Sequence, residues 1–410
     1  MSTERTPHPA FSYLIYLGCA IAFCTIPFGL SAGRNLFFVS SYIAFIAVCL
    51  NLKFYVKNKQ NLVLPILFFT VGMATILWRT YFKQPDEYID IYRAYMGTGK
   101  LQIATAFILL IALNERLNMK HWFIALALMI GLSVNFYGLY QGLFLHIERV
   151  ELNFDRATGA SYLMTAISLA MMHAILLLRT KYRLPLYIVG FIFTFSTIIM
   201  TGTRAAMLVY PVAVALSILL TKDLISKKHK AILAIAAPFV LAACGFLFKS
   251  EIEYRIADFE TNLKMADQPQ IDNSIMSRVS MQRVAIQAGN AAPLGQSAEQ
   301  RGNEIKAIVA KDPNLVGVMP YITVHMHNEL LETYSIKGVW GVAFLLALYI
   351  GLFISSLRPY RNPLLLGTTV SLFAYGLSDV VFFSIEATAI FCLVIIFSVL
   401  SVANRNKQQD

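Results

Sequence analysis

Long apolar runs alternate with short polar connectors over most of the chain. There are about twelve such runs, and about twenty apolar residues in a helix are enough to cross a bilayer. The pattern therefore predicts an all-α polytopic membrane protein with about twelve transmembrane helices. The expected spans cover residues 11–30, 36–50, 63–78, 101–113, 122–144, 160–178, 185–200, 205–220, 232–248, 339–354, 364–380 and 388–402.

One long polar segment, residues 249–337, interrupts this pattern before the last spans. Its first part, 251–265, carries apolar residues near helical spacing, which predicts an amphipathic helix lying on the membrane. A second helix is expected over 278–288, broken before Pro293, and a third should begin near Met326. The sequence thus predicts three parts: transmembrane helices 1–9 in residues 1–248, a largely helical loop domain in 249–337, and transmembrane helices 10–12 with a tail in 338–410.

Composition supports this class, and charge sets its orientation. Only 14% of the residues are charged, against about a quarter in soluble domains. The formal net charge is +11, but the basic residues cluster in short connectors such as 53–60 and 179–183, which argues against a nucleic-acid partner. Basic connectors face the cytoplasm. We therefore expect both termini in the cytoplasm, the 249–337 segment on the outer side, and membrane lipids around the spans.

Residues that bind metals or nucleotides are not grouped in this sequence. The five cysteines all lie inside apolar spans without ligand spacing and are interpreted as packing residues. A metal site takes three or more protein ligands, and no third histidine lies near His325 and His327. Because a phosphate-binding glycine loop is also missing, we expect neither a metal nor a nucleotide cofactor.

His327 is the first candidate for chemistry. It lies in the stretch 324–332, where the polar segment meets the next span, together with a second imidazole, an amide and two carboxylates. A neutral imidazole suits general-base catalysis near pH 7. A helix starting near Met326 would place Tyr334 on the face of His327 and His325 on another face, so we interpret His325 as structural. The alternative for His327 is also a structural histidine, hydrogen-bonded at the interface.

Arg204 is the second candidate, in the tight turn 201–204 that opens a span on the outer side. A helix start carries partial positive charge, so an arginine there is disfavoured unless an anion is present. Free amides, a glycine turn and the hydroxyls of Thr201 and Thr203 together suit an anion such as phosphate. The alternative is an arginine whose charged head only snorkels to the interface.

Three further charged residues belong to the outer side. Arg278 and Arg283 lie five residues apart on the second outer helix and do not share a face, so one can bind an anion while the other is solvated. Asp379 lies at the outer mouth of the penultimate span. It can orient His327 or pair with an arginine, or it can be a plain charge at a helix end.

These motifs resemble the O-antigen ligase family of Gram-negative inner membranes, within the wider group that includes O-antigen polymerases. The features that carry the resemblance are His327-Asn328-Glu329 with the glycines at 338 and 341, the 201–204 turn, Arg278 ahead of Pro293-Leu294-Gly295, and the 376–379 stretch that ends in Asp379. The resemblance covers most of the chain. One departure is that Gln296-Ser297-Ala298 follows Gly295 without a second glycine pair.

The resemblance implies a GT-C-like membrane glycosyltransferase. Such a ligase moves the O-antigen glycan from undecaprenyl pyrophosphate to a sugar hydroxyl of the lipid A-core, on the periplasmic side of the inner membrane, without ATP or a metal. The runner-up is a polymerase with a lipid-linked glycan as acceptor. A transporter or flippase of an anionic lipid is the rival from another class, although its charges are expected near mid-membrane. The implied site residues are His327, Arg204 and Arg278 as catalytic groups, with Thr201, Thr203, Asn328, Tyr334 and Asp379 binding the substrate.

Overall fold

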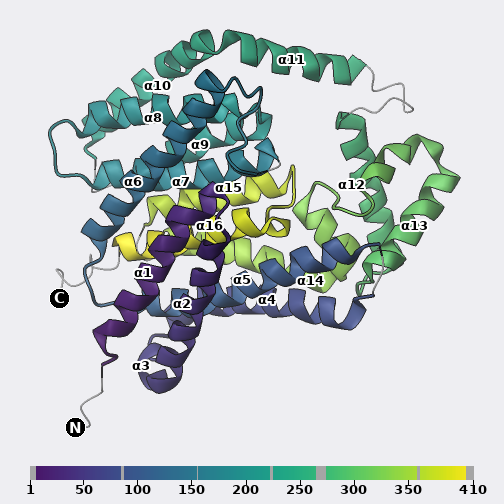
Figure 1. Cartoon of the computed structure of the whole chain (residues 1–410), viewed down its shortest axis with the longest axis horizontal. Coiled ribbons are helices and arrows are strands. Elements are labelled where there is room, and N and C mark those ends of the chain that lie inside the picture. The colour runs from purple at the N-terminus through teal and green to yellow at the C-terminus, as the bar shows by residue number, and fades with distance from the viewer. Residues whose placement is uncertain are drawn as a thin grey trace.

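The fold was analysed in a computed structural model, which describes residues 6–84, 87–154, 156–221, 225–264, 274–357 and 361–402. All the regular elements in these ranges are helices (Figure 1). The protein is an all-α polytopic membrane protein, as the sequence predicts. The predicted tail 404–410, Met265 at the end of the predicted surface helix, and parts of four connectors (85–86, 155, 222–224 and 358–360) lie outside the described residues.

Helices occupy the positions of all the expected spans. In the described ranges, ten helical segments are long and apolar enough to cross a membrane, and two apolar helices, α9 (Arg204–Leu220) and α15 (Pro363–Gly376), are shorter. The ten segments contain α1 (Pro9–Thr25), α2 (Ser31–Leu50), α4 (Val63–Phe82), α5 (Ile89–Leu113), α6 (Lys120–Leu139), α7 (Ala157–Leu177), α8 (Arg183–Met200), α10 (Lys227–Leu247), α14 (Glu329–Leu357) and α16 (Ile385–Val402). Short helices join or extend some of them: η1 (Ile26–Phe28), α3 (Leu52–Tyr55), η2 (Lys59–Leu62), η3 (Tyr140–Phe144) and η6 (Val381–Phe383).

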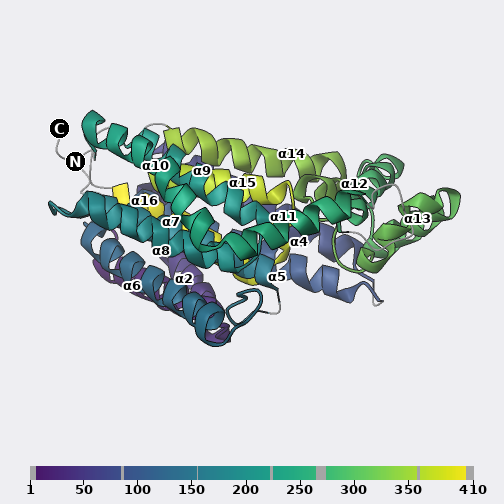
Figure 2. The same ribbon diagram turned by 90° about the horizontal axis from the view of Figure 1, so that it is seen from above.

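Helix α7 forms the centre of the bundle, with α16 beside it (Figures 1 and 2). The most apolar part of α7 is buried along its whole length. Two of its polar side chains have internal partners: the hydroxyl of Thr165 lies 2.7 Å from that of Tyr375, and Ser168 accepts a hydrogen bond from Asn135. Buried polar groups need such partners because no water reaches them. The start of α7 is therefore a rigid platform, and it carries two residues of the site described below.

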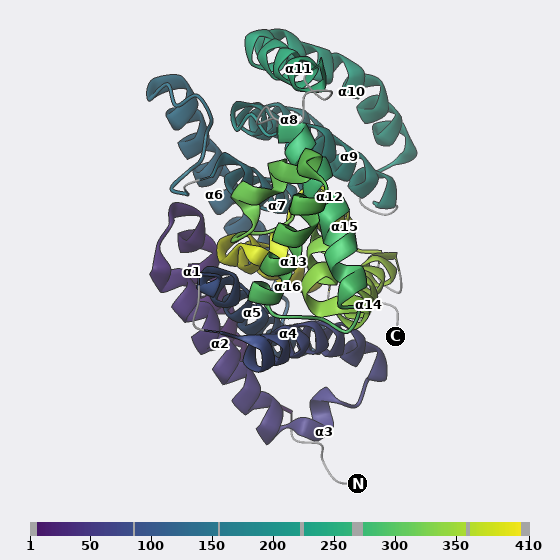
Figure 3. The ribbon, with the colours of Figure 1, turned by 90° about the vertical axis from the view of Figure 1, so that its right-hand side faces the viewer.

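The polar segment folds into α11 (Lys249–Lys264), α12 (Ser274–Ala291), α13 (Ala298–Lys311) and η5 (Pro313–Tyr321). Helices α12 and α13 lie at one end of the molecule, opposite the start of α1 and the end of α16, and Figure 3 looks onto that end (Figures 1–3). The expected helix over 278–288 is the middle of α12. Helix α13 was not predicted, although Ser297 caps it by accepting a hydrogen bond from the Gln300 N–H.

Helix α14 is broken at Gly338, which adopts φ 68° and ψ −161°. The carbonyl of Pro293 accepts a hydrogen bond from the Val339 N–H across this break, at 2.9 Å. A Cβ at Gly338 would lie 2.2 Å from that carbonyl oxygen, so only glycine fits. The turn at 293–295 therefore lies directly against the break, and Gly295 also has a positive φ, of 99°. The division into three domains, with a boundary at 337/338, stays a prediction.

Two predicted boundaries are wrong. Helix α5 begins at Ile89, well before the expected start of its span at residue 101. Tyr92 and Tyr95 explain the difference, because both are buried in an apolar cluster with α12 and α14. Helix α14 begins at Glu329 instead of near Met326, which leaves His327 in a turn with φ 45°.

Candidate active site

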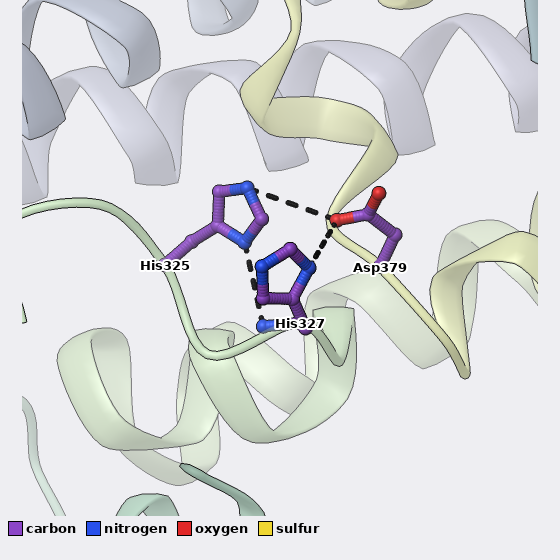
Figure 4. Close-up of side chains that lie close together, drawn as sticks. All are labelled: His325, His327 and Asp379. Atoms are coloured by element: carbon purple, nitrogen blue, oxygen red, sulfur yellow. Dashed lines mark hydrogen bonds and ion pairs between the residues drawn. The ribbon is translucent and has the colours of Figure 1, made fainter. Parts of the chain in front are cut away.

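His327 and Asp379 are 52 residues apart in the chain and lie side by side in the structure (Figure 4). Nδ1 of His327 is 3.0 Å from Oδ1 of Asp379. His327 belongs to the turn between η5 and α14, and Asp379 to the turn between α15 and η6. The structure thus brings together an imidazole and a carboxylate that can orient it, one of the three interpretations that the sequence leaves open for Asp379.

His325 joins this pair, contrary to the expectation that it lies on another face. Its Nε2 is 3.7 Å from the same oxygen of Asp379, and its ring centroid is 4.4 Å from that of His327 (Figure 4). The expectation was wrong because it assumed a helix over both histidines. In the observed turn, the two side chains converge.

The turn that carries His327 is held by side chains of the following helix, α14, and of α13. Glu332 accepts a hydrogen bond from the Met326 N–H at 2.9 Å and is itself paired with Arg301 at 2.8 Å. Asn328 caps α14 by accepting from the Leu331 N–H. A left-handed φ is uncommon for a residue other than glycine and persists only where the surroundings impose it. These contacts impose the left-handed φ of His327.

Burial and hydrogen bonding set the charges of this group. Burial lowers the pKa of His325 to about 4, despite the nearby Asp379 carboxylate, so the imidazole is neutral at pH 7. Burial by itself raises the pKa of Asp379, but the hydrogen bond from His327 and the two imidazoles hold it below its ordinary value overall. Because a carboxylate only accepts hydrogen bonds, the proton of neutral His327 belongs on Nδ1. Its Nε2 then carries a lone pair and can accept a proton.

Four arginines line a cavity of about 430 Å³. We call it the arginine cavity; the arginines that line it are Arg149, Arg204, Arg255 and Arg278. Asp258 is the one carboxylate among the described lining residues, 3.7 Å from Nη1 of Arg204. That Nη1 is buried and has no hydrogen-bond partner among the described residues. Such an excess of positive charge and free donors suits an anion.

The tight turn before α9 holds two of these arginines. Gly202 has φ 61°, and a Cβ there would lie 2.7 Å from the guanidinium of Arg255, so the guanidinium rests directly on the glycine. Nε of Arg149 donates to the carbonyl oxygen of Thr201 at 3.1 Å. Burial, followed by the charge of Arg255, lowers the pKa of Arg149. The turn therefore gathers like charges, which are costly without a counter-ion.

The group around His327 opens into a different cavity, of about 380 Å³. We call it the histidine cavity; His325, His327 and Asp379 line it together with residues 153–163 and 380–387. Among the described residues, only Thr158 and Tyr162 line both cavities. They are one turn apart on α7, and the Tyr162 hydroxyl is 3.5 Å from Asp379. The cavity of His327 and the cavity of the arginines thus meet at a shared wall.

A known protein and a family model both match this chain, the protein along most of its length. A family model described as O-antigen ligase matches residues 189–346, which include α9, the arginines at 204 and 278, and His327. The O-antigen ligase of Escherichia coli (strain K12) is 25% identical over 353 residues, covering 85% of this chain and 83% of the relative. The chain is similar to the O-antigen ligase family. This similarity supports a glycosyl-transferring enzyme of the O-antigen ligase type.

The structure places the other predicted site residues either in one of the two cavities or outside both. Thr203 and Arg278 line the arginine cavity, whereas Thr201 lines neither cavity and instead holds Arg149. Asn328 also lines neither cavity, since its side chain bonds to the backbone of Leu331 and Leu377. Arg283 is exposed outside both cavities, so of the two helix-α12 arginines only Arg278 faces an anion site.

Tyr334 does not share a face with His327, and this prediction is wrong. Its hydroxyl donates to Asn290 at 2.8 Å, and its ring packs on Gly289. The physical reason is the same late start of α14, which removes the helical register between the two residues. Tyr334 therefore ties α12 to α14 and lines neither cavity.

Sequence reasoning missed Arg149, Arg255, Tyr162 and the pair Arg301–Glu332. Arg149 lies in an outer loop, and Arg255 on the predicted surface helix, so an inventory of outer arginines could have included both. No local pattern distinguishes Arg301 from a solvated helix residue, although its side chain is fully buried. Its role depends on the packing of α13 against α14.

A metal ion is the competing interpretation of the histidine group in this site. One ligand atom each from His325, His327 and Asp379 lies within 4.8 Å of the others. Asp379, distant in the sequence, supplies the third ligand beside the two histidines. Three protein ligands and a water molecule are a common zinc arrangement. The residues therefore fit an ion, and a metal requirement has to be tested directly.

Proposed function

We propose that this enzyme transfers the O-antigen glycan from undecaprenyl pyrophosphate to a sugar hydroxyl of the lipid A-core. The observation that carries the proposal is the shared wall between the two cavities. A base oriented by a carboxylate faces one cavity, four arginines face the other, and Thr158 and Tyr162 line both. A group transfer from a pyrophosphate to a hydroxyl needs these two environments side by side.

His327 acts as the general base in this proposal. Its Nε2 takes the proton of the acceptor hydroxyl while the hydroxyl oxygen attacks the anomeric carbon of the donor sugar. Asp379, 3.0 Å from Nδ1, holds the ring in the tautomer that has a free Nε2 and stabilises the imidazolium that forms. The bond between the anomeric carbon and the phosphate oxygen breaks, and direct attack inverts the configuration.

The arginines stabilise the leaving group. The electron pair of the broken bond goes to undecaprenyl pyrophosphate, whose negative charge grows in the transition state. Guanidinium groups fixed beforehand around that position stabilise the developing charge without reorganising. Arg204 is suited to this role because its buried Nη1 has no hydrogen-bond partner among the described residues. Arg278 approaches the same cavity from α12.

The reaction needs no nucleotide and no metal in this proposal. The donor is already activated by its pyrophosphate, so no further phosphoryl donor is required. Four arginines supply positive charge at the leaving group, the place where a divalent ion acts in other pyrophosphate reactions.

The active site is proposed to face the periplasm from the inner membrane, with both termini in the cytoplasm. Two observations support this orientation. The basic connectors, such as 179–183, follow the rule for cytoplasmic loops. Helices α12 and α13, which belong to the 249–337 segment, lie at the end opposite the start of α1 (Figure 1).

The test compares lipopolysaccharide from cells with and without the gene for this protein. A ligase leaves intact lipid A-core without the O-antigen ladder when it is deleted. A polymerase instead leaves core bearing a single repeat unit. Purified protein should also transfer glycan to lipid A-core in liposomes. Transfer only to a second lipid-linked glycan would identify a polymerase, and movement of intact lipid across the bilayer a flippase.

A further inference from the structure

We propose that the histidine cavity is the binding site for the acceptor sugar, and that Arg156 and Glu386 determine which sugar is accepted. The ligand class is a polyhydroxylated sugar at the end of a glycolipid. This inference rests on the proposed function, since it assigns one of its two substrates to one of the two cavities.

The position of the base selects the cavity. A hydroxyl that loses its proton to His327 must lie within about 3.2 Å of the imidazole. His327 lines the histidine cavity and does not line the arginine cavity, while the four arginines show the opposite distribution. The acceptor hydroxyl therefore enters from the histidine cavity, and the anomeric carbon lies between the two, near Tyr162.

Charge supports the same assignment. The charged side chains described in the wall of the histidine cavity, apart from its imidazoles, are one arginine, Arg156, and two carboxylates, Asp379 and Glu386. Two carboxylates repel a pyrophosphate, whereas hydroxyl groups donate hydrogen bonds to them. The balance in the arginine cavity is four arginines to one aspartate. The two cavities thus differ in the ligand they favour, and only the histidine cavity suits a polyol.

Arg156 and Glu386 are the charged side chains in this wall that are left to contact a sugar, since Asp379 is bound to His327. Asn153 also lines the cavity, but it accepts from the Tyr137 hydroxyl and donates to the Phe28 carbonyl. Ser384 accepts from the Ala387 N–H. Neither Arg156 nor Glu386 has a side-chain hydrogen bond or ion pair with any described residue. Arg156 is exposed and Glu386 half-buried, so both are accessible to a ligand that enters from outside.

The kinetic test uses purified enzyme in liposomes, with undecaprenyl-pyrophosphate-linked O-antigen as donor and lipid A-core as acceptor. Losing a hydrogen bond to a charged group should raise KM for the acceptor about tenfold in Arg156→Ala and in Glu386→Gln, with KM for the donor changed less than about twofold. Arg255→Ala, in the arginine cavity, should instead raise KM for the donor and change KM for the acceptor less than about twofold. Arg93→Ala removes an arginine from an exposed pair with Asp90 and serves as the control with normal kinetics. A raised donor KM in Arg156→Ala and Glu386→Gln, or no change in either constant, would overturn the proposal.

A labelling experiment tests the same site without turnover. Ser384→Cys places a thiol in the histidine cavity, and Asn262→Cys places one in the arginine cavity. Lipid A-core should slow maleimide labelling at position 384 only, and undecaprenyl pyrophosphate should slow it at position 262 only. Labelling is read on the separate peptides by mass spectrometry, because native Cys49 is exposed. The reverse pattern, or no protection at position 384, contradicts the acceptor site. Failure of the proposed function looks different: wild-type enzyme transfers no glycan to lipid A-core, whatever the labelling shows.

Discussion

Arg301 and Glu332 form an ion pair in which both side chains are fully buried. Nη1 of Arg301 lies 2.8 Å from each carboxylate oxygen of Glu332. Glu332 also accepts hydrogen bonds from the Tyr95 hydroxyl and the Met326 N–H. Since Met326 directly precedes His327, the pair connects α13 and α5 to the turn that carries the base.

Removing one partner of this pair should destabilise the protein and disturb the site. Arg301→Met leaves a buried carboxylate without its counter-charge, a change that typically costs about 3–5 kcal/mol. Thermal unfolding in detergent should show a clear fall in Tm, with loss of glycan transfer. Lys306→Ala breaks an exposed pair with Glu87 and should change stability by less than about 1 kcal/mol. Equal unfolding curves for Arg301→Met and wild type would contradict the role of the pair.

His327→Ala should abolish transfer in a protein that still folds and inserts. Loss of a general base typically lowers the rate by about 10²–10⁴-fold. His325→Ala should have a smaller effect, because His325 lies 3.7 Å from Asp379 and does not make its short hydrogen bond. Transfer rates of the two variants, measured at equal amounts of folded protein, decide the assignment. Similar rates in both variants would rule out His327 as the base.

Arg204 should act through the geometry of its guanidinium as well as its charge. A guanidinium can hold two phosphate oxygens at once, whereas lysine is a point charge. Arg204→Ala should lose about 2–4 kcal/mol of transition-state stabilisation, or about 30-fold to 1,000-fold in rate. Arg204→Lys should lose much of the activity as well, and Arg278 should show the same ranking. Full activity in Arg204→Lys would instead indicate a snorkelling arginine. Arg283→Ala, on the same helix as Arg278 but outside the cavity, is the matched control.

Acidification should destabilise the folded protein through His325. The pKa of this imidazole is about 4 in the fold and about 6.5 in an unfolded chain. Between these values the unfolded state binds more protons, so stability falls as pH decreases from about 6.5 to about 4. Because the pKa of Asp379 is lowered in the fold, its contribution to folding stability is lost only at lower pH. Tm measured across this window should fall less steeply in His325→Asn than in wild type. Parallel pH profiles would contradict a neutral, buried His325.

Transfer should continue in excess chelator and without nucleotide. His325, His327 and Asp379 could hold an ion, so this experiment separates a hydrogen-bonded base from a metal centre. The measurement is glycan transfer by purified enzyme after dialysis against chelator, with metal content determined in parallel. Activity that disappears with chelator and returns with a divalent ion would replace the proposed mechanism.

The sequence alone determined the fold class and the parts of the molecule that meet at the site. Membrane spans are visible locally because each must be apolar over about twenty residues, and helices are found at all the expected positions. The 201–204 turn, Arg278 and His327 were also visible, since each lies where a polar residue borders an apolar span. Asp379 was a candidate partner of His327, but its distance from the imidazole could not be known.

The tertiary structure decided how these side chains face one another. Helical spacing placed Tyr334 beside His327 and His325 away from it, and both expectations failed because Glu332 and Arg301 hold residues 326–327 in a turn. Those contacts join α13 to α14, and long-range packing of this kind overrides local helical preference. The separation of base and arginines into two cavities also depends on α7, whose burial fixes Tyr162 between them. Such relationships depend on packing between segments far apart in the sequence, and no local pattern specifies them.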